Sequence, residues 1–144
     1  PLGGAMTIQH TIPRWRTDLI NTARRATHAW TTEASNRRID RVQLQDFQGL
    51  SLTTRAGVRY HLTTVAGGTP STRLLTASGF TRAVTNGEIL NNVSVGLGRQ
   101  GGLAYSNTAG AIDIGIRTSS AQVWRIALIF PDGSRSVSSQ ACWV

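Results

Sequence analysis

The stretch PRWRTDLINTARRATHAWTTEASN, from Pro13 to Asn36, is the part of the sequence on which our prediction of the fold class depends. Its apolar residues recur at steps of three or four, the spacing that lays one apolar stripe along an α-helix. The residues between them are polar and would face solvent. We therefore expect a long amphipathic helix over residues 13–36, with its stripe packed on a sheet. The predicted helix–sheet packing residues are Trp15, Leu19, Ala23, Ala26, Trp30 and Ala34.

After this stretch the apolar residues alternate with a period of two, which is typical of strands. The alternation is clearest in residues 58–65, 112–117 and 123–130. The sequence Pro131-Asp132-Gly133 then predicts a hairpin turn, with glycine in the left-handed position. One helix followed by many short strands predicts the α+β class, with a long N-terminal helix packed on an antiparallel sheet.

The length of 144 residues favours a single domain that can bury a core without a metal or a disulfide. The opening PLGGAM, residues 1–6, is unlike the rest, and we interpret it as the remnant of a cleaved tag and cloning junction. We expect residues 7–144 to form one globular domain, helical over about 13–36 and β-rich over 41–144. The lone Cys142 either is a buried, inert thiol or pairs with another chain.

Few residue patterns in this chain favour catalysis. The three histidines, His10, His28 and His61, have no metal-ligand spacing, and the acidic residues are scattered singly. The glycine-rich segments lack the spacing of a phosphate-binding loop. We therefore expect no catalytic, metal-binding or cofactor-binding site, and a protein that is not an enzyme.

The charge balance is strongly positive. Fifteen basic residues stand against seven acidic ones, giving a net charge of +8, and every basic residue is arginine. Such a bias has two explanations, a GC-rich genome or hot habitat, or a surface that binds phosphate. Arginines on a helix face can also simply cover apolar surface with their stems. The candidate DNA or anion contacts are Arg37, Arg38, Arg59, Arg117, Arg125 and Arg135.

Two segments carry a resemblance to a known family. A helix that opens at Pro13 and ends in WTTEASNRR is similar to the soluble part of bacterial type IV pilin-like proteins. The run LNNVSVGLGRQGGLAYSNTAGAIDIGI, followed by VWRIALIFPDGSRSVS, resembles the C-terminal strands and final hairpin of one subgroup. That subgroup contains minor pilins and type II secretion minor pseudopilins of the H-subunit and FimT-like kind.

The resemblance implies a structural role without chemistry. A minor pilin or pseudopilin is a subunit of a type IV pilus, a competence pilus or a type II secretion filament, and it acts by assembly with other pilins. It also implies an apolar N-terminal helix upstream of residue 12, which would anchor the protein in the inner membrane with this domain on the periplasmic side. The basic surface adds possible contact with double-stranded DNA during uptake.

Two further readings stay open on the sequence alone. The chain could be a stand-alone DNA-binding module that uses an arginine-rich surface to follow phosphates without reading sequence. It could also be a small enzyme or an unrelated β-rich structural domain.

Overall fold

The structure, a computed structural model, describes residues 22–34, 36–70, 80–83, 85–90, 101–118 and 121–143. Within these ranges the chain forms ten strands and no helix. No helix long and apolar enough to cross a bilayer therefore occurs in them. The strands are β1 (Arg25–Ala34), β2 (Arg37–Gln45), β3 (Gly57–Thr63), β4 (Phe80–Ala83), β5 (Glu88–Leu90), β6 (Gly101–Tyr105), β7 (Ala111–Arg117), β8 (Gln122–Ile129), β9 (Arg135–Val137) and β10 (Ala141–Trp143).

The predicted α+β class is wrong, because the second half of the expected helix is a strand. Residues 25–34 form β1, which pairs antiparallel with β2 from Arg25 opposite Gln45 to Ala34 opposite Arg37. Of the predicted packing residues, Ala23 is buried just before β1, Ala26 and Trp30 lie half-buried within it, and Ala34 is its last residue. Trp15 and Leu19 lie outside the described residues.

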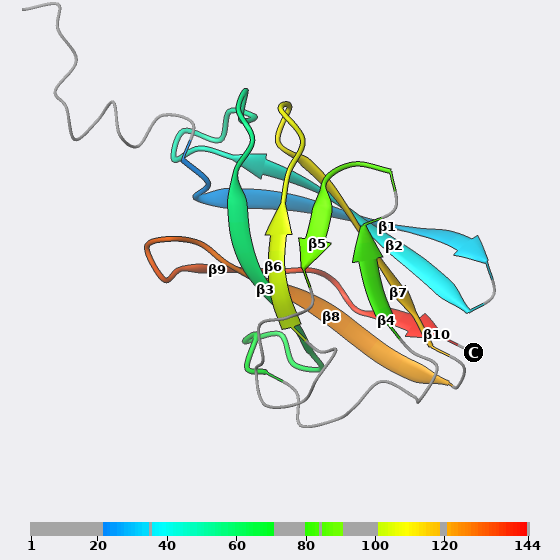
Figure 1. The fold of residues 1–144 in the computed structure, drawn as a ribbon. Helices are drawn as coiled ribbons and strands as arrows, with labels where there is room; N and C mark the ends of the chain where they lie inside the picture. The colour runs from blue at the N-terminus through cyan, green and yellow to red at the C-terminus, as the bar shows by residue number, and fades with distance from the viewer. Residues whose placement is uncertain are drawn as a thin grey trace, which may run out of the picture.

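The strands form two antiparallel sheets. The first has the order β1-β2-β7-β4, and the second has the order β10-β8-β3-β6-β5, with β9 paired to β8. In Figure 1, β3 of the second sheet crosses in front of β1 of the first. The described part of the chain is therefore a β-sandwich.

Both sheets contribute to one apolar core. The predicted alternations are confirmed here, since Ile112, Ile114 and Ile116 are fully buried on one face of β7. The second sheet contributes, from β3, β6, β8 and β10, the buried residues Val58, Tyr60, Leu62, Ala104, Trp124, Ile126, Leu128, Ala141 and Trp143. Burying these side chains on both inner faces is what holds the two sheets together.

The hairpin predicted at residues 131–133 is also confirmed. Gly133 has φ of 87°, the left-handed conformation that glycine adopts without strain. Asp132 shapes the turn by accepting hydrogen bonds from the Ser134 backbone N–H at 2.9 Å and from its hydroxyl at 2.6 Å. These bonds lower the pKa of Asp132 to about 2, and Arg24 adds a smaller effect in the same direction.

The alternating exposure of β1 gives a direct test of the corrected fold. We expect cysteines placed singly at Thr27, Ala29 and Thr31, whose side chains are exposed, to react quickly with a thiol reagent. A cysteine at Ala26 or Trp30 should react more slowly, because both face the core. The measurement is the labelling rate in a Cys142→Ser background.

A helix predicts a different pattern of labelling rates. Residue 27 would then lie on the packed stripe, four residues from Ala23 and three from Trp30. Slow labelling at residue 27 together with fast labelling at residue 29 would contradict the strand.

Candidate functional site

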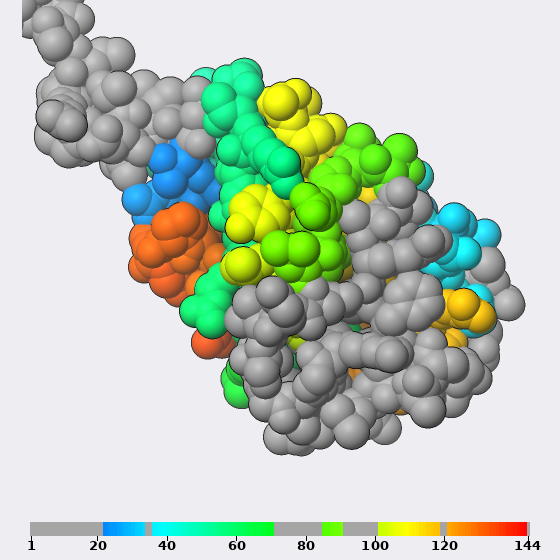
Figure 2. Space-filling model, viewed as in Figure 1, coloured from blue at the N-terminus to red at the C-terminus, as the bar shows by residue number. Residues whose placement is uncertain are grey.

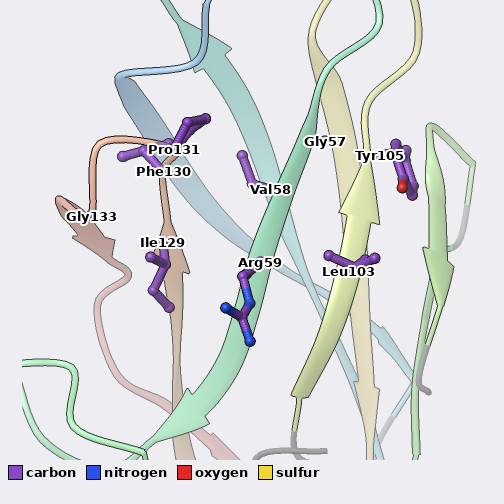
Figure 3. A pocket seen from close by; sticks show the side chains of 9 residues that line it. All are labelled: Gly57, Val58, Arg59, Leu103, Tyr105, Ile129, Phe130, Pro131 and Gly133. Atoms are coloured by element: carbon purple, nitrogen blue, oxygen red, sulfur yellow. The ribbon is translucent and has the colours of Figure 1, made fainter. Parts of the chain in front are cut away.

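A row of four side chains crosses the outer face of the second sheet. In the strand register Arg135 pairs with Ile129, Ile129 with Arg59, and Arg59 with Leu103. Cross-strand partners project from the same face of a sheet, and the core occupies the other face. We call Arg135, Ile129, Arg59 and Leu103 the cross-strand row. Figure 3 shows Arg59 on β3 between Ile129 of β8 and Leu103 of β6.

The row borders a hollow of about 420 Å³ at one end of this face. A volume of this size lies within the range of about 300–1,000 Å³ that is typical of ligand sites. Its lining is mostly apolar with one cationic side chain, that of Arg59. The lining residues are Gly57, Val58, Arg59, Leu103, Tyr105, Ile129, Phe130, Pro131 and Gly133.

Tyr105 forms the wall of this hollow on the side of β6. Its ring lies against Gly57, its cross-strand partner, where an added Cβ would come within 2.8 Å of the ring. The guanidinium of Arg55 lies over the ring at 5.1 Å from the centroid and forms an ion pair with Glu88 at 2.8 Å. Glycine at position 57 therefore lets the ring lie low on the sheet, and Arg55 covers it.

A second hollow, of about 180 Å³, lies beside Arg135 on the same face. Gly68, in the loop after β3, accepts a hydrogen bond through its carbonyl oxygen from Nε2 of the buried His61 ring. This bond holds the loop over the inner end of the hollow. Burial lowers the pKa of His61, the bond to Gly68 opposes this, and the nearby positive charge of Arg135 lowers it further. His61 therefore favours the neutral form, and in that form Nε2–H donates to Gly68.

Arg59 and Arg135 are both exposed, and no ion pair or hydrogen bond holds either side chain among the residues that the structure describes. Neighbouring strands are about 4.8 Å apart, so the two Cα atoms, two strands apart, are separated by about 10 Å. In the space-filling view β3 and the turn between β8 and β9 reach the surface on this side (Figure 2). These two cations are therefore available to an anion from solution.

Of the other predicted arginines, three lie in the first sheet, and Arg125 lies on β8 of the second sheet, four residues before Ile129. Arg37 and Arg117 are cross-strand partners in the first sheet, and Arg37 contacts Glu33 at 3.0 Å. Arg38 lies over the Trp143 ring, 6.0 Å from its centroid. Arg125 is half-buried and donates to the Ser138 carbonyl at 3.1 Å. The structure thus pairs Arg37 with Arg117 in the first sheet, where Arg37 already has Glu33 as a partner, and places Arg59 and Arg135 in one row of the second sheet.

A separate polar cluster joins the two sheets along the edge of β1. Nδ1 of His28 lies 2.7 Å from Oδ2 of Asp40, and its Nε2 lies 2.8 Å from the Ser136 hydroxyl. The Ala29 backbone N–H donates to the second carboxylate oxygen of Asp40 at 3.2 Å. We call Asp40, His28 and Ser136 the clasp, because they link β2, β1 and β9.

The clasp has the bonding order of a serine–histidine–aspartate triad, carboxylate to imidazole to hydroxyl. However, Ser136 pairs with the fully buried Leu128, so its side chain shares the face that points between the sheets. Neither hollow described above is lined by any of the three residues. This geometry supports a structural role, in which a fully buried carboxylate is satisfied by partners from a neighbouring strand.

Sequence reasoning missed most of these residues. Tyr105, Leu103 and Ile129 read as ordinary strand residues, and only their register shows that they surround Arg59. The expected helix placed His28 and Asp40 in different elements, and the β1–β2 register makes them diagonal neighbours, since His28 lies opposite Val42 and Asp40 lies opposite Trp30. Among the described residues, no three His, Cys, Asp or Glu side chains could hold a metal ion. Cys142, expected to be buried or paired, is an exposed free thiol.

Comparisons with known proteins give no relatives. No protein-family model, no curated protein and no solved structure matches the chain. Function is therefore argued from the geometry of this molecule.

The clasp predicts a large effect of His28 on stability. We expect His28→Ala to lower the free energy of unfolding by about 3 kcal/mol, because it leaves the buried Asp40 carboxylate without its partner. Thr27→Ala, at the exposed neighbouring position, should change stability by less than about 1 kcal/mol. Urea unfolding of both variants measures the difference. An equal effect of the two substitutions would show that the clasp does not stabilise the fold.

Proposed function

We propose that this chain acts by binding and assembly, as a filament subunit of the minor pilin or pseudopilin kind that contacts DNA through its cross-strand row. The observation that carries the DNA contact is the placement of Arg59 and Arg135 in one row, exposed and without counter-charges among the described residues. A protein with a net charge of +8 also attracts a polyanion over distance.

The chemistry of the row favours binding that does not depend on base sequence. The guanidinium of arginine can donate two parallel hydrogen bonds to phosphate oxygens. Contacts to phosphates position a protein on the nucleic acid without recognising its bases. The row lies on a sheet, and the described residues contain no helix that could enter a major groove. Binding of this kind weakens as salt rises, because cations released from the nucleic acid drive it.

The filament role rests on the order of strands and turns in the C-terminal half. There the described residues contain β6, the glycine turn at Gly110, β7, β8 and the final hairpin at Gly133. The valine-rich start of the run that carries the resemblance, residues 91–97, lies outside the described residues. Residues 25–34 form a strand, so the anchoring helix that the resemblance implies upstream of residue 12 does not continue through them.

A stand-alone nucleic-acid-binding domain is the second candidate. The specific observation in its favour is that β1 is the edge strand of a sandwich and is not a helix leading away from it. Both candidates share the cross-strand row, and they differ in where the protein is found in the cell.

Removing the two free arginines should weaken DNA binding. We expect the double variant Arg59→Ala, Arg135→Ala to lower the magnitude of the slope of log K against log salt concentration by about 1.4 to 1.8, since each phosphate contact contributes about 0.7 to 0.9. Fluorescence anisotropy with labelled DNA over a salt series measures the slope.

The matched control is Arg41→Ala, which removes the same charge from an exposed position on β2 in the other sheet. It should leave the slope nearly unchanged. If wild-type protein does not bind DNA at low salt, or if the control loses as much as the double variant, the cross-strand row is not a DNA site.

The filament role predicts the location of the native protein. In the bacterium that produces it, the protein should be found in the inner membrane and in sheared surface filaments, because a pilin is stored in one and assembled into the other. Immunodetection in fractionated cells provides the measurement. A protein recovered only from the cytoplasm would instead support the stand-alone candidate.

A further inference from the structure

We infer that the hollow beside Arg59 holds an unpaired nucleotide, so that this face prefers single-stranded nucleic acid to duplex. The inference rests on the proposed contact with DNA and names the form of nucleic acid that the same face takes.

The first argument is the composition of the walls. A surface that only follows duplex phosphates needs cations, because the bases are stacked inside the helix. The hollow instead places one cation among apolar side chains, with Leu103 on β6, Ile129 on β8 and Pro131 in the turn. Apolar walls stabilise a complex only if the ligand buries apolar surface against them, and an unpaired base does so.

The second argument is the aromatic wall. Tyr105 is only partly buried, and its ring is held from two sides, by the backbone of Gly57 below it and by the guanidinium of Arg55 over it. Glu88 in turn holds Arg55 at 2.8 Å. An aromatic ring and a guanidinium plane are the two groups on which proteins stack unpaired bases. Since Gly57 and Arg55 cover the two faces of the Tyr105 ring, the ring presents its edge to the hollow, and the exposed Arg55 guanidinium is the plane left for a base to stack on. Because both groups are already positioned, a base loses little of its binding energy to ordering the protein.

The third argument is the order of groups along the cross-strand row. Its cationic end is Arg135, Arg59 lies two strands further on, and Leu103 follows on the next strand. Leu90 of β5 extends the row beyond Leu103 and is also exposed. A single strand laid across the sheet places phosphates at the two arginines and a base against Leu103 and Tyr105. A rigid duplex cannot turn one base away from its stack without losing pairing energy.

The experiment compares the full chain binding to a labelled twelve-nucleotide oligothymidine and to a duplex of equal length at one salt concentration. We expect binding to the single strand to be at least tenfold tighter. Leu103→Ala and Tyr105→Leu should each weaken single-strand binding by about fivefold, the loss expected from one base–side-chain contact, and leave duplex binding unchanged. The control is Leu50→Ala, which removes a more exposed apolar side chain outside the row.

Each outcome separates this inference from the proposed function. Equal or tighter binding of the duplex overturns the inference and leaves the DNA contact intact. Absence of binding to both forms overturns both. Thermal unfolding shows whether the variants are folded. If folded Leu103→Ala and Tyr105→Leu both bind the single strand as tightly as the wild type, the strand binds elsewhere on the protein, and the inference is overturned.

Discussion

The buried carboxylate of Asp40 is the constraint on which the arrangement of the N-terminal strands depends. It lies in the middle of β2 with no exposed surface, where an unpaired carboxylate would be strongly unfavourable. Its partners, the His28 ring and the Ala29 backbone N–H, both come from β1. They reach it because residues 28 and 29 run beside β2 as part of a paired strand. Satisfying this buried carboxylate therefore favours a strand where local periodicity also allows a helix.

The same residues close the sandwich along one edge. Besides the clasp, Trp30 donates from Nε1 to the Ser139 carbonyl at 2.8 Å, and its ring meets Trp143 edge-to-face at 5.9 Å. Arg24 forms an ion pair with Asp132 at 2.7 Å, and in Figure 2 the start of β1 lies against the turn that follows β8. These contacts hold the edge of one sheet to the edge of the other, and the outer face of the second sheet is exposed at Arg59 and Arg135 but covered at His61 by the loop after β3. The cross-strand row lies on that face.

Strands β3, β7 and β8 could be predicted because their period of two is unambiguous, whereas the short strands β4 and β5 were not predicted. Apolar residues alternate with polar ones in β3, β7 and β8, and the core residues fall on the expected faces. Residues 23–34 were ambiguous, since Ala26 and Trp30 fit a helical stripe and also, with His28 between them, one face of a strand. Alanine favours a helix and threonine a strand, and pairing with β2 decides between them. Four arginines were predicted at outward strand positions, and three of them, Arg59, Arg117 and Arg135, are exposed. The alternation of residue types could not show which of these arginines share a sheet.

The sequence by itself determined the positive charge, the all-arginine basic set, the faces of the later strands and the turn at Gly133, because each is a local property of composition, period or backbone freedom. Only the tertiary structure decided that residues 25–34 form a strand, that His28 meets Asp40 and Ser136, and that Arg59 and Arg135 flank Ile129 on one surface. These depend on strand order and register, which are set by long-range pairing and by the burial of a shared core. No window of neighbouring residues contains that information.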